Sequence, residues 1–169
     1  MSRRHISGMT NPEVGILMGS KNDFETLKPC CDVLDEFGIA WEAKVLSAHR
    51  TPDAALDYAK TAEERGLQVI ICAAGGAAHL AGFIAAKSVL PILAVPIAST
   101  PLGGLDALLA MVQMPGGIPV GTLAIGKWGA TNAGVLAVQI IGTKRNDLRD
   151  RMRAWRAKKA DAILATTLP

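Results

Sequence analysis

Short apolar runs alternate along the chain with longer segments whose apolar residues recur every three or four positions. The apolar runs predict strands over residues 14–18, 41–46, 68–73, 91–95 and 120–125. The periodic segments predict helices over residues 24–37, 52–65, 79–88, 105–112 and 130–141. Strands that alternate with helices in this way predict an α/β fold, with a three-layer doubly wound parallel sheet of the flavodoxin-like or Rossmann-like kind.

The two ends of the chain differ from this regular middle. Residues 1–13 are polar and are expected to form a flexible N-terminus, whereas residues 14–143 form the single α/β domain that would carry catalysis. Residues 144–169 predict a basic amphipathic helix whose apolar face contains Leu148, Met152, Trp155 and Ile163. That face packs either on the chain's own domain or on a neighbouring subunit, and the residues alone favour neither.

Composition and charge narrow the classes of function. The chain has 169 residues and is 50% hydrophobic, which is enough for one domain with a sizeable core. Its net charge of +3 arises in residues 144–169, which hold eight basic and three acidic side chains and leave ten basic and twelve acidic ones before them. Because this charge lacks interleaved aromatic residues and a recognition motif, we expect no nucleic-acid binding.

Neither a membrane span nor a disulfide framework is expected. Residues 69–86 carry no Lys, Arg, Asp or Glu, but His79 and several small residues there fit a strand, a loop and a helix better than a membrane span. Residues 1–11 lack the apolar core of a signal peptide, so we expect a cytoplasmic protein with His5 in a disordered segment. The three cysteines have neither disulfide nor zinc-site spacing and are expected to be reduced and structural.

Three loops that follow predicted strands carry the candidate chemistry. Residues 20–23, 47–50 and 75–79 follow the first, second and third strands. Because the carboxyl ends of parallel strands lie at one edge of a sheet, these loops are expected to share a cleft. The run 73–78 contains only Gly and Ala, so its backbone N–H groups can approach an anion closely, although such a turn also packs well without a ligand.

The second of these loops joins an imidazole to a fixed cation. His49 is the best acid/base candidate, because an imidazole has an unperturbed pKa of about 6.5 and a loop position lets it meet a substrate. Arg50 is a candidate phosphate anchor because its planar guanidinium suits bidentate contacts. Thr51 and Pro52 are expected to begin the next helix as its N-cap and first turn.

The remaining polar residues of the predicted cleft have two interpretations each. Ser20 and Asp23 either cap a helix or contact a ligand, and Asp23 suits the hydroxyl groups of a ribose. His79 is either a ligand contact or a structural imidazole. The sequence has no G-x-x-x-x-G-K-[ST] loop, no G-x-G-x-x-G after a strand and no metal-ligand spacing. These residues therefore predict chemistry without cofactor or metal on a small anionic ligand, and a nucleotide fits best.

Five motifs taken together are specific. In chain order they are Gly19-Ser20-x-x-Asp23, Ser47-Ala48-His49-Arg50-Thr51-Pro52, Ala74-Gly75-Gly76-Ala77-Ala78-His79-Leu80, Gly104-Leu105-Asp106 and Gln113-Met114-Pro115. With these motifs, residues 14–142 resemble the N5-carboxyaminoimidazole ribonucleotide mutase family of purine biosynthesis, in its bacterial form. The chain differs from many members of that family at Asn22, where Ser is common, and at Ala81, where Pro is common.

The resemblance implies an intramolecular carboxyl transfer. A carboxylate would move from the exocyclic nitrogen of the substrate to the adjacent imidazole carbon, through carbon dioxide held in a closed pocket, without ATP, cofactor or metal. The resemblance implies His49 as the acid/base, Arg50 and Ser20 as phosphate contacts and Asp23 as the ribose contact, with loop 75–79 closing over the base. The expected substrate-binding residues are Ser20, Asn22, Asp23, Ser47, Arg50, Gly75, Gly76, Ala78, His79 and Leu80.

The resemblance also implies partners. Members of the family form homo-octamers whose active sites include residues of neighbouring subunits, which would place the helix of Trp155 and the Pro/Gly loops at interfaces. The substrate would come from an ATP-dependent synthetase that makes the N-carboxylated ribonucleotide, as a step toward inosine monophosphate in the cytoplasm.

Three alternative functions remain open. Direct carboxylation of aminoimidazole ribonucleotide by free carbon dioxide uses the same scaffold, but the sequence Arg50-Thr51-Pro52 favours the mutase. A carboxylase of pincer-cofactor biosynthesis shares this domain, but such proteins are longer before the first strand. A non-catalytic nucleotide-binding module is disfavoured by the complete set of Ser20, Asp23, His49 and Arg50.

Overall fold

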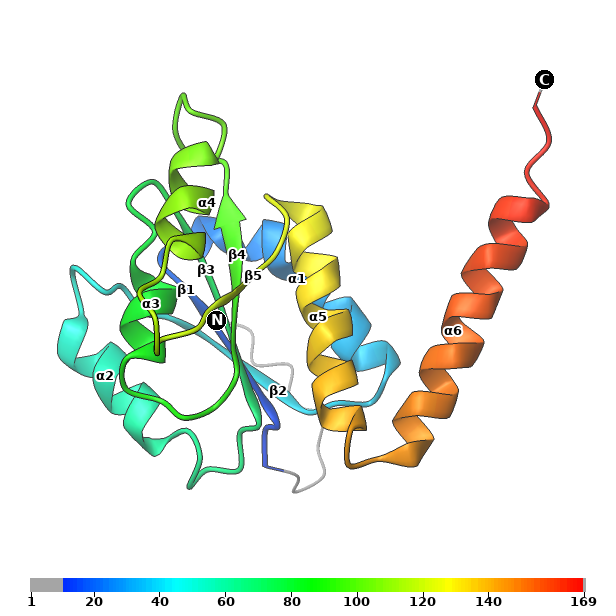
Figure 1. The fold of residues 1–169 in the computed structure, drawn as a ribbon, viewed down its shortest axis with the longest axis horizontal. Helices are drawn as coiled ribbons and strands as arrows, with labels where there is room; N and C mark the ends of the chain where they lie inside the picture. Colours follow the sequence, from blue (N-terminus) through cyan, green and yellow to red (C-terminus); the bar gives the residue numbers. More distant parts are fainter. Residues whose placement is uncertain (1–10, 169) are drawn as a thin grey trace.

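The computed structural model describes residues 11–168, and its strands and helices alternate along the chain (Figure 1). The strands are β1 (Val14–Met18), β2 (Trp41–Val45), β3 (Val69–Gly75), β4 (Ile92–Ile97) and β5 (Gly121–Thr122). The helices are the 3-10 turn η1 (Lys21–Asp23), α1 (Phe24–Glu36), α2 (Pro52–Thr61), α3 (Leu80–Ala85), α4 (Leu105–Val112), α5 (Lys127–Gly142) and α6 (Asn146–Leu164). The predicted alternation is therefore confirmed.

The five strands form one parallel sheet in the order β2-β1-β3-β4-β5. Helices α1 and α5 cover one face, and α2, α3 and α4 cover the other (Figure 1). This is the doubly wound, flavodoxin-like fold that the sequence predicts, and its strand order reverses between β1 and β3. Loops at the carboxyl ends of these two strands therefore lie where such sheets bind ligands.

The central strands are apolar throughout because both of their faces are buried. On β3, Ile71 and Ala73 face α1 and α5, whereas Ile70 and Cys72 face the helices of the opposite layer. All residues of β1 are buried as well. A parallel sheet that is covered on both sides requires such continuous apolar runs.

The three cysteines belong to this core. Cys30 and Cys31 lie on α1 and Cys72 on β3, and all three are free and buried. Burial, with smaller effects of neighbouring carboxylates, raises the pKa of the Cys31 thiol to about 12. Thiolates are therefore scarce at neutral pH, and these side chains act as small apolar core residues, as expected.

The predicted strand ends are wrong at the β4–β5 edge of the sheet. β4 continues through Pro96 to Ile97, whereas β5 covers only two residues. Leu123 still donates its N–H to the carbonyl of Ala94, but the next bond would need an N–H on Pro96, which has none. Beyond that point the chain stays beside β4 because the N–H of Gly126 donates to the carbonyl of Pro96.

Two helices are shorter than expected. α2 ends at Thr61, and residues 62–66 form a turn that closes at Gly66 with φ +90°. α3 begins after His79 and ends at Ala85. Apolar spacing determines which face of a helix packs, but it does not specify the turn at which the backbone hydrogen bonds stop.

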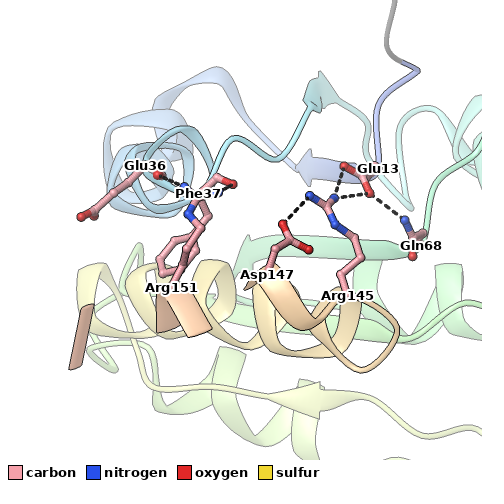
Figure 2. A network of polar contacts seen from close by, with 7 residues as sticks. All are labelled: Glu13, Glu36, Phe37, Gln68, Arg145, Asp147 and Arg151. Carbon is pink, nitrogen blue, oxygen red and sulfur yellow. Dashed lines mark hydrogen bonds and ion pairs between the residues drawn. The ribbon is translucent and has the colours of Figure 1, made fainter. Parts of the chain in front are cut away.

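The first half of α6 is fixed to the end of α1 (Figure 2). The Arg151 guanidinium donates to the carbonyl oxygens of Glu36 and Phe37 at 2.8 and 3.0 Å. These carbonyls have no partner within α1, and a cation there also complements the helix dipole. Trp155 adds a hydrogen bond of 2.9 Å from Nε1 to the Glu36 carboxylate and packs on the Phe37 ring at 6.1 Å between centroids.

A second polar network joins the start of α6 to the start of β1 (Figure 2). Arg145 Nη1 lies 3.4 Å from a Glu13 carboxylate oxygen, which also accepts a hydrogen bond of 2.8 Å from the Gln68 side chain. Arg145 Nη2 pairs with Asp147 at 3.3 Å. Glu13 belongs to the segment 1–13 that was expected to be flexible; residues 1–10 of that segment, including His5, lie outside the described part of the chain.

The second half of α6 leaves the body of the domain (Figure 1). Leu148 and Met152 are buried against α5, Trp155 is half-buried, and Ile163 is 73% exposed. The expected apolar face therefore packs on its own domain only along the first half of the helix. Within residues 11–168, no helix is long and apolar enough to cross a membrane.

Close packing of α5 on α1 generates a stability prediction. A Cβ on Gly134 of α5 would lie 2.9 Å from the Cys30 carbonyl oxygen and 3.1 Å from the Val33 Cβ. Gly134→Ala should therefore lower the free energy of unfolding in urea by about 2 kcal/mol. Gly142→Ala is the control on the same helix, because its Cβ would meet only ordinary contacts at 3.6 Å. Equal effects of the two substitutions would contradict the packing argument.

Candidate active site

A cleft of about 300 Å³ opens at the carboxyl ends of the central strands. Loops after β1, β2 and β3 and the segment after β4 line it, with the residues Gly19, Ser20, Asn22, Asp23, Ser47, Ala48, His49, Arg50, Ala74, Gly75, Ala77, His79, Leu80 and Ser99. The expectation that the first three loops share one cleft is confirmed.

The turn after β1 is held by a reciprocal capping box. The Ser20 hydroxyl accepts a hydrogen bond from the N–H of Asn22 at 3.2 Å, and the Asp23 carboxylate accepts one from the N–H of Ser20 at 3.0 Å. Both side chains also line the cleft. Capping and contact with a ligand are therefore compatible for these two residues.

Asp23 is the one charged residue in the part of the chain described here that is classed as buried, with 9% of its surface exposed. Burial raises the pKa of its carboxyl group above the ordinary value, and the hydrogen bond from Ser20 opposes this shift. A buried carboxylate with lone pairs to spare gains from further donors. The hydroxyl groups of a ligand in the cleft are suitable donors.

The loop after β2 is a tight turn organised by two hydroxyl groups. Ser47 Oγ accepts hydrogen bonds from the N–H groups of His49 and Arg50 at 3.3 and 3.2 Å. Thr51 is the N-cap residue of α2 and Pro52 is in its first turn, as predicted, but the Thr51 hydroxyl makes no capping bond. It instead accepts from the N–H of Ser47 and donates to the Ser47 carbonyl. These bonds hold the backbone of His49 and Arg50 and leave their side chains at the cleft.

The Arg50 side chain reaches across to the turn after β1. Its Nη2 donates to the carbonyl oxygen of Gly19 at 2.8 Å. A guanidinium carries five N–H donors, so this bond orients the group and leaves donors for an anion. The nearby start of α1 also favours negative charge.

The two cleft histidines contact each other. His49 Nε2 and His79 Nδ1 are 2.9 Å apart, and the rings are nearly perpendicular at 79°. One nitrogen of this contact must carry the hydrogen while the other accepts it, so the tautomer of one ring determines that of the other. Both imidazoles are exposed in the cleft, which excludes a buried structural role for His79.

The loop after β3 brings only part of the expected residues to the cleft. Gly75, His79 and Leu80 line it, but Gly76 and Ala78 do not. Ala78 is 1% exposed and packs in the core beside α3 and α4. In a turn this tight, with a bond of 2.8 Å from the N–H of Ala78 to the carbonyl of Gly76, successive residues face different sides.

Five lining residues were not predicted. Gly19, Ala48, Ala74 and Ala77 are chain neighbours of predicted residues, whereas Ser99 comes from a fourth loop. The signal for Ser99 was its place in the loop between the fourth predicted strand and the next helix, but candidate chemistry was assigned only to the loops after the first three strands.

The cleft combines two kinds of chemistry. The Arg50 guanidinium and the turn after β1 suit an anion, whereas the coupled imidazoles suit transfer of a proton. Within residues 11–168, no group of three His, Cys, Asp or Glu side chains is placed to hold a metal ion. The described side chains thus support acid/base chemistry on an anchored anionic ligand.

A family model and several sequence relatives all indicate the same protein family. The model of the AIR carboxylase family matches residues 13–162, a range that includes all four cleft loops. The chain is 56% identical to the N5-carboxyaminoimidazole ribonucleotide mutase of Vibrio cholerae, over 92% of this chain and 97% of that protein. The mutases of Bacillus subtilis and Escherichia coli are 53% and 48% identical, over 92% and 97% of this chain and 96% and 98% of their own lengths.

Solved structures share the fold. The crystal structure of Treponema denticola PurE has a TM-score of 0.79 and 27% sequence identity, and the match covers 90% of this chain and 94% of that one. A 3-dehydroquinate dehydratase-like protein from Bifidobacterium longum has a TM-score of 0.51 at 14% identity, covers 78% of this chain and 98% of its own, and shares only the fold.

The raised pKa of Asp23 predicts how stability varies with pH. Because the folded state holds the Asp23 proton more tightly than the unfolded state, this group stabilises the fold below the ordinary pKa of an aspartate, and it loses that contribution as pH rises through its higher folded pKa. In urea unfolding, Asp23→Asn should therefore gain stability relative to wild type as pH increases from about 3.5 to 6. Exposed Asp161→Asn is the control for loss of a carboxylate, and an opposite trend for Asp23→Asn would contradict the burial argument.

Proposed function

The chain belongs to the AIR carboxylase family, and we propose that it is an N5-carboxyaminoimidazole ribonucleotide mutase of purine biosynthesis. It converts N5-carboxyaminoimidazole ribonucleotide into 4-carboxy-5-aminoimidazole ribonucleotide. The observation that carries this proposal is the meeting of Arg50, Asp23 and the His49–His79 pair in one cleft. The N5-carboxyaminoimidazole ribonucleotide mutase of Vibrio cholerae supports it, because the two chains are 56% identical over 92% of this one.

We place the phosphate and ribose of the substrate at the β1 and β2 loops. Arg50 and Ser20 contact the phosphate, where the guanidinium and the start of α1 both favour negative charge. Asp23 accepts hydrogen bonds from the ribose hydroxyls. Asn22 keeps an N–H donor at the position where many relatives have Ser, so its amide can also bind a phosphate oxygen.

We place the carboxylated base at His49 and the loop after β3. The bond between the exocyclic nitrogen and the carboxylate breaks, carbon dioxide is released, and the nitrogen gains a proton. The adjacent ring carbon then attacks the carbon dioxide, and a base removes the proton from that carbon. The retained carbon dioxide reacts efficiently because its acceptor lies beside it in the same site.

The proton balance requires only one acid/base group. The nitrogen gains one proton and the ring carbon loses one, so a single imidazole ends each cycle in the protonation state in which it began. His49 fills this role, and His79 is its positioning residue, because the contact of 2.9 Å between them fixes which nitrogen of His49 carries hydrogen.

We propose that neighbouring copies of the chain close this cleft, as a homo-octamer. Leu105, Leu109 and Val112 leave an apolar face of α4 about half exposed, and the second half of α6 carries exposed Ile163 and Leu164. Contiguous apolar side chains of this kind are typical of interfaces between subunits. A closed site also retains carbon dioxide better than the open cleft of one chain.

We propose a cytoplasmic place for this reaction, in the synthesis of inosine monophosphate. The chemistry of the substrate supports a functional partner, because an N-carboxylated amine must first be made by a synthetase that spends ATP. The mutase itself then needs no ATP, because it moves a carboxylate that is already attached.

Interconversion of the two carboxylated ribonucleotides tests the proposed function. Purified protein should convert one into the other without ATP. When labelled bicarbonate is present during turnover, little of the label should be incorporated into the product. Extensive entry of label would instead favour direct carboxylation of aminoimidazole ribonucleotide by free carbon dioxide. No conversion at all would refute both carboxylating activities and leave a nucleotide-binding module.

His49→Asn separates proton transfer from binding. This variant should lose at least about a thousandfold in kcat, because it removes the acid/base group, while its Kd for the product ribonucleotide stays within about threefold of wild type. Turnover and calorimetric binding measure the two effects.

Arg50→Ala is the matched comparison from the neighbouring position. It should weaken binding of the ribonucleotide by about tenfold or more, because a charge-assisted contact with phosphate is lost. If His49→Asn mainly weakened binding and Arg50→Ala mainly lowered kcat, the two roles would be assigned the wrong way round.

A further inference from the structure

Three serine side chains line the cleft, and one of them differs from the others. Ser20 Oγ and Ser47 Oγ each accept hydrogen bonds from backbone N–H groups, so they organise the loops to which they belong. The backbone N–H of Ser99 donates to the carbonyl of Ile97. Among residues 11–168, the Ser99 hydroxyl makes no hydrogen bond. The Ser99 hydroxyl is thus at the cleft without a structural task.

The place of this hydroxyl is fixed by its contact with Gly75. A Cβ on Gly75 would lie 1.9 Å from Ser99 Oγ and 2.8 Å from Ser99 Cβ, so the serine side chain rests directly on the α-carbon of Gly75. The carbonyl oxygen of Ile97 would be 3.0 Å from the same Cβ. Only glycine at position 75 lets Ser99 come this close to the loop after β3.

The strand order separates Ser99 from the phosphate end of the cleft. Arg50 follows β2 and Ser20 follows β1, whereas Gly75 is the last residue of β3 and Ser99 follows β4. In the order β2-β1-β3-β4, the candidate phosphate anchor and Ser99 therefore belong to opposite sides of the switch point. His79 lies in the loop that follows β3, the strand next to β4 in this order.

We propose that Ser99 contacts the substrate directly, and that its hydroxyl donates a hydrogen bond to the migrating carboxylate. This assignment rests on the proposed function, which places the carboxylated base at the β3 side of the cleft. A hydroxyl hydrogen rotates freely, so it can follow the carboxylate from the nitrogen to the neighbouring carbon.

A neutral donor suits this task better than a cation. A lysine or arginine at this position would stabilise the bound carboxylates strongly and so oppose the release of carbon dioxide that the reaction requires. A hydroxyl favours the carboxylated ribonucleotides over the decarboxylated one only moderately. Ser99 is therefore a residue that sets specificity for carboxylated ligands while still permitting decarboxylation.

Ser99→Ala tests this assignment through the ratio of two affinities. The Kd values of 4-carboxy-5-aminoimidazole ribonucleotide and of aminoimidazole ribonucleotide, which lacks the carboxylate, are measured by calorimetry for the full-length protein. Ser99→Ala should weaken binding of the carboxylated ligand by about tenfold and leave that of the decarboxylated ligand within about twofold of wild type. A merely structural role would change both affinities equally.

Thr100→Val is the matched control in the same loop. The Thr100 hydroxyl donates to the Asp106 carboxylate at 2.7 Å and does not line the cleft, so this change disturbs the loop without removing the proposed contact. The affinity ratio should stay at the wild-type value in this control.

The outcomes distinguish two failures. If wild type binds and interconverts the ribonucleotides but Ser99→Ala keeps the wild-type affinity ratio, the role of Ser99 is refuted and the proposed function stands. If Thr100→Val shifts the ratio as much as Ser99→Ala does, the effect belongs to the loop and the assignment is likewise refuted. If wild type binds neither ligand, the proposed function and the assignment fail together.

Discussion

The site depends on one constraint, the fixed register in which β1 pairs in parallel with both of its neighbours. Met18 at the end of β1 pairs with Val45 of β2 on one side and with Ala73 of β3 on the other. Two residues beyond this row come Ser20, Ser47 and Gly75, which all line the cleft. A slip of one strand by a single residue would reverse the faces of its buried side chains, so the core that stabilises the sheet also fixes the relative heights of the three loops.

Within that frame, short polar contacts assign separate tasks to the loops. The bond from Arg50 to the Gly19 carbonyl ties the β2 loop to the β1 loop, and the contact between His49 and His79 ties it to the β3 loop. The neighbouring residues His49 and Arg50 therefore reach in different directions. The guanidinium reaches the turn after β1, and the imidazole reaches His79 in the loop after β3. Under the proposed function, one short segment thus supplies both the anchor for the ribonucleotide and the group that transfers a proton on its base.

Much of this was predictable from the sequence, because apolar runs and helical periodicity report burial directly. The parallel sheet and the cleft of three loops follow from such local patterns. So does the position of the sequence neighbours His49 and Arg50 in the loop after the second strand. Ser99 could not be found in the same way, because residues 96–104 mix Ser, Thr, Pro and Gly, and no local pattern marks which of them reaches the cleft. The contact between His49 and His79 joins residues 30 positions apart, which no local pattern encodes. Ile163 has helical spacing with Leu148, but the helix leaves the body before reaching it.

The central claim is that an imidazole at position 49 moves the proton while the rest of the cleft holds the ribonucleotide. Chemical rescue of His49→Ala tests it most directly, because free imidazole can enter the space that the side chain vacates. The account predicts that added imidazole restores turnover by at least about tenfold over the unrescued variant, and that substituted imidazoles restore it to a degree that follows their basicity. Binding of the ribonucleotide without any rescue, or turnover of His49→Ala near the wild-type rate, would contradict the account.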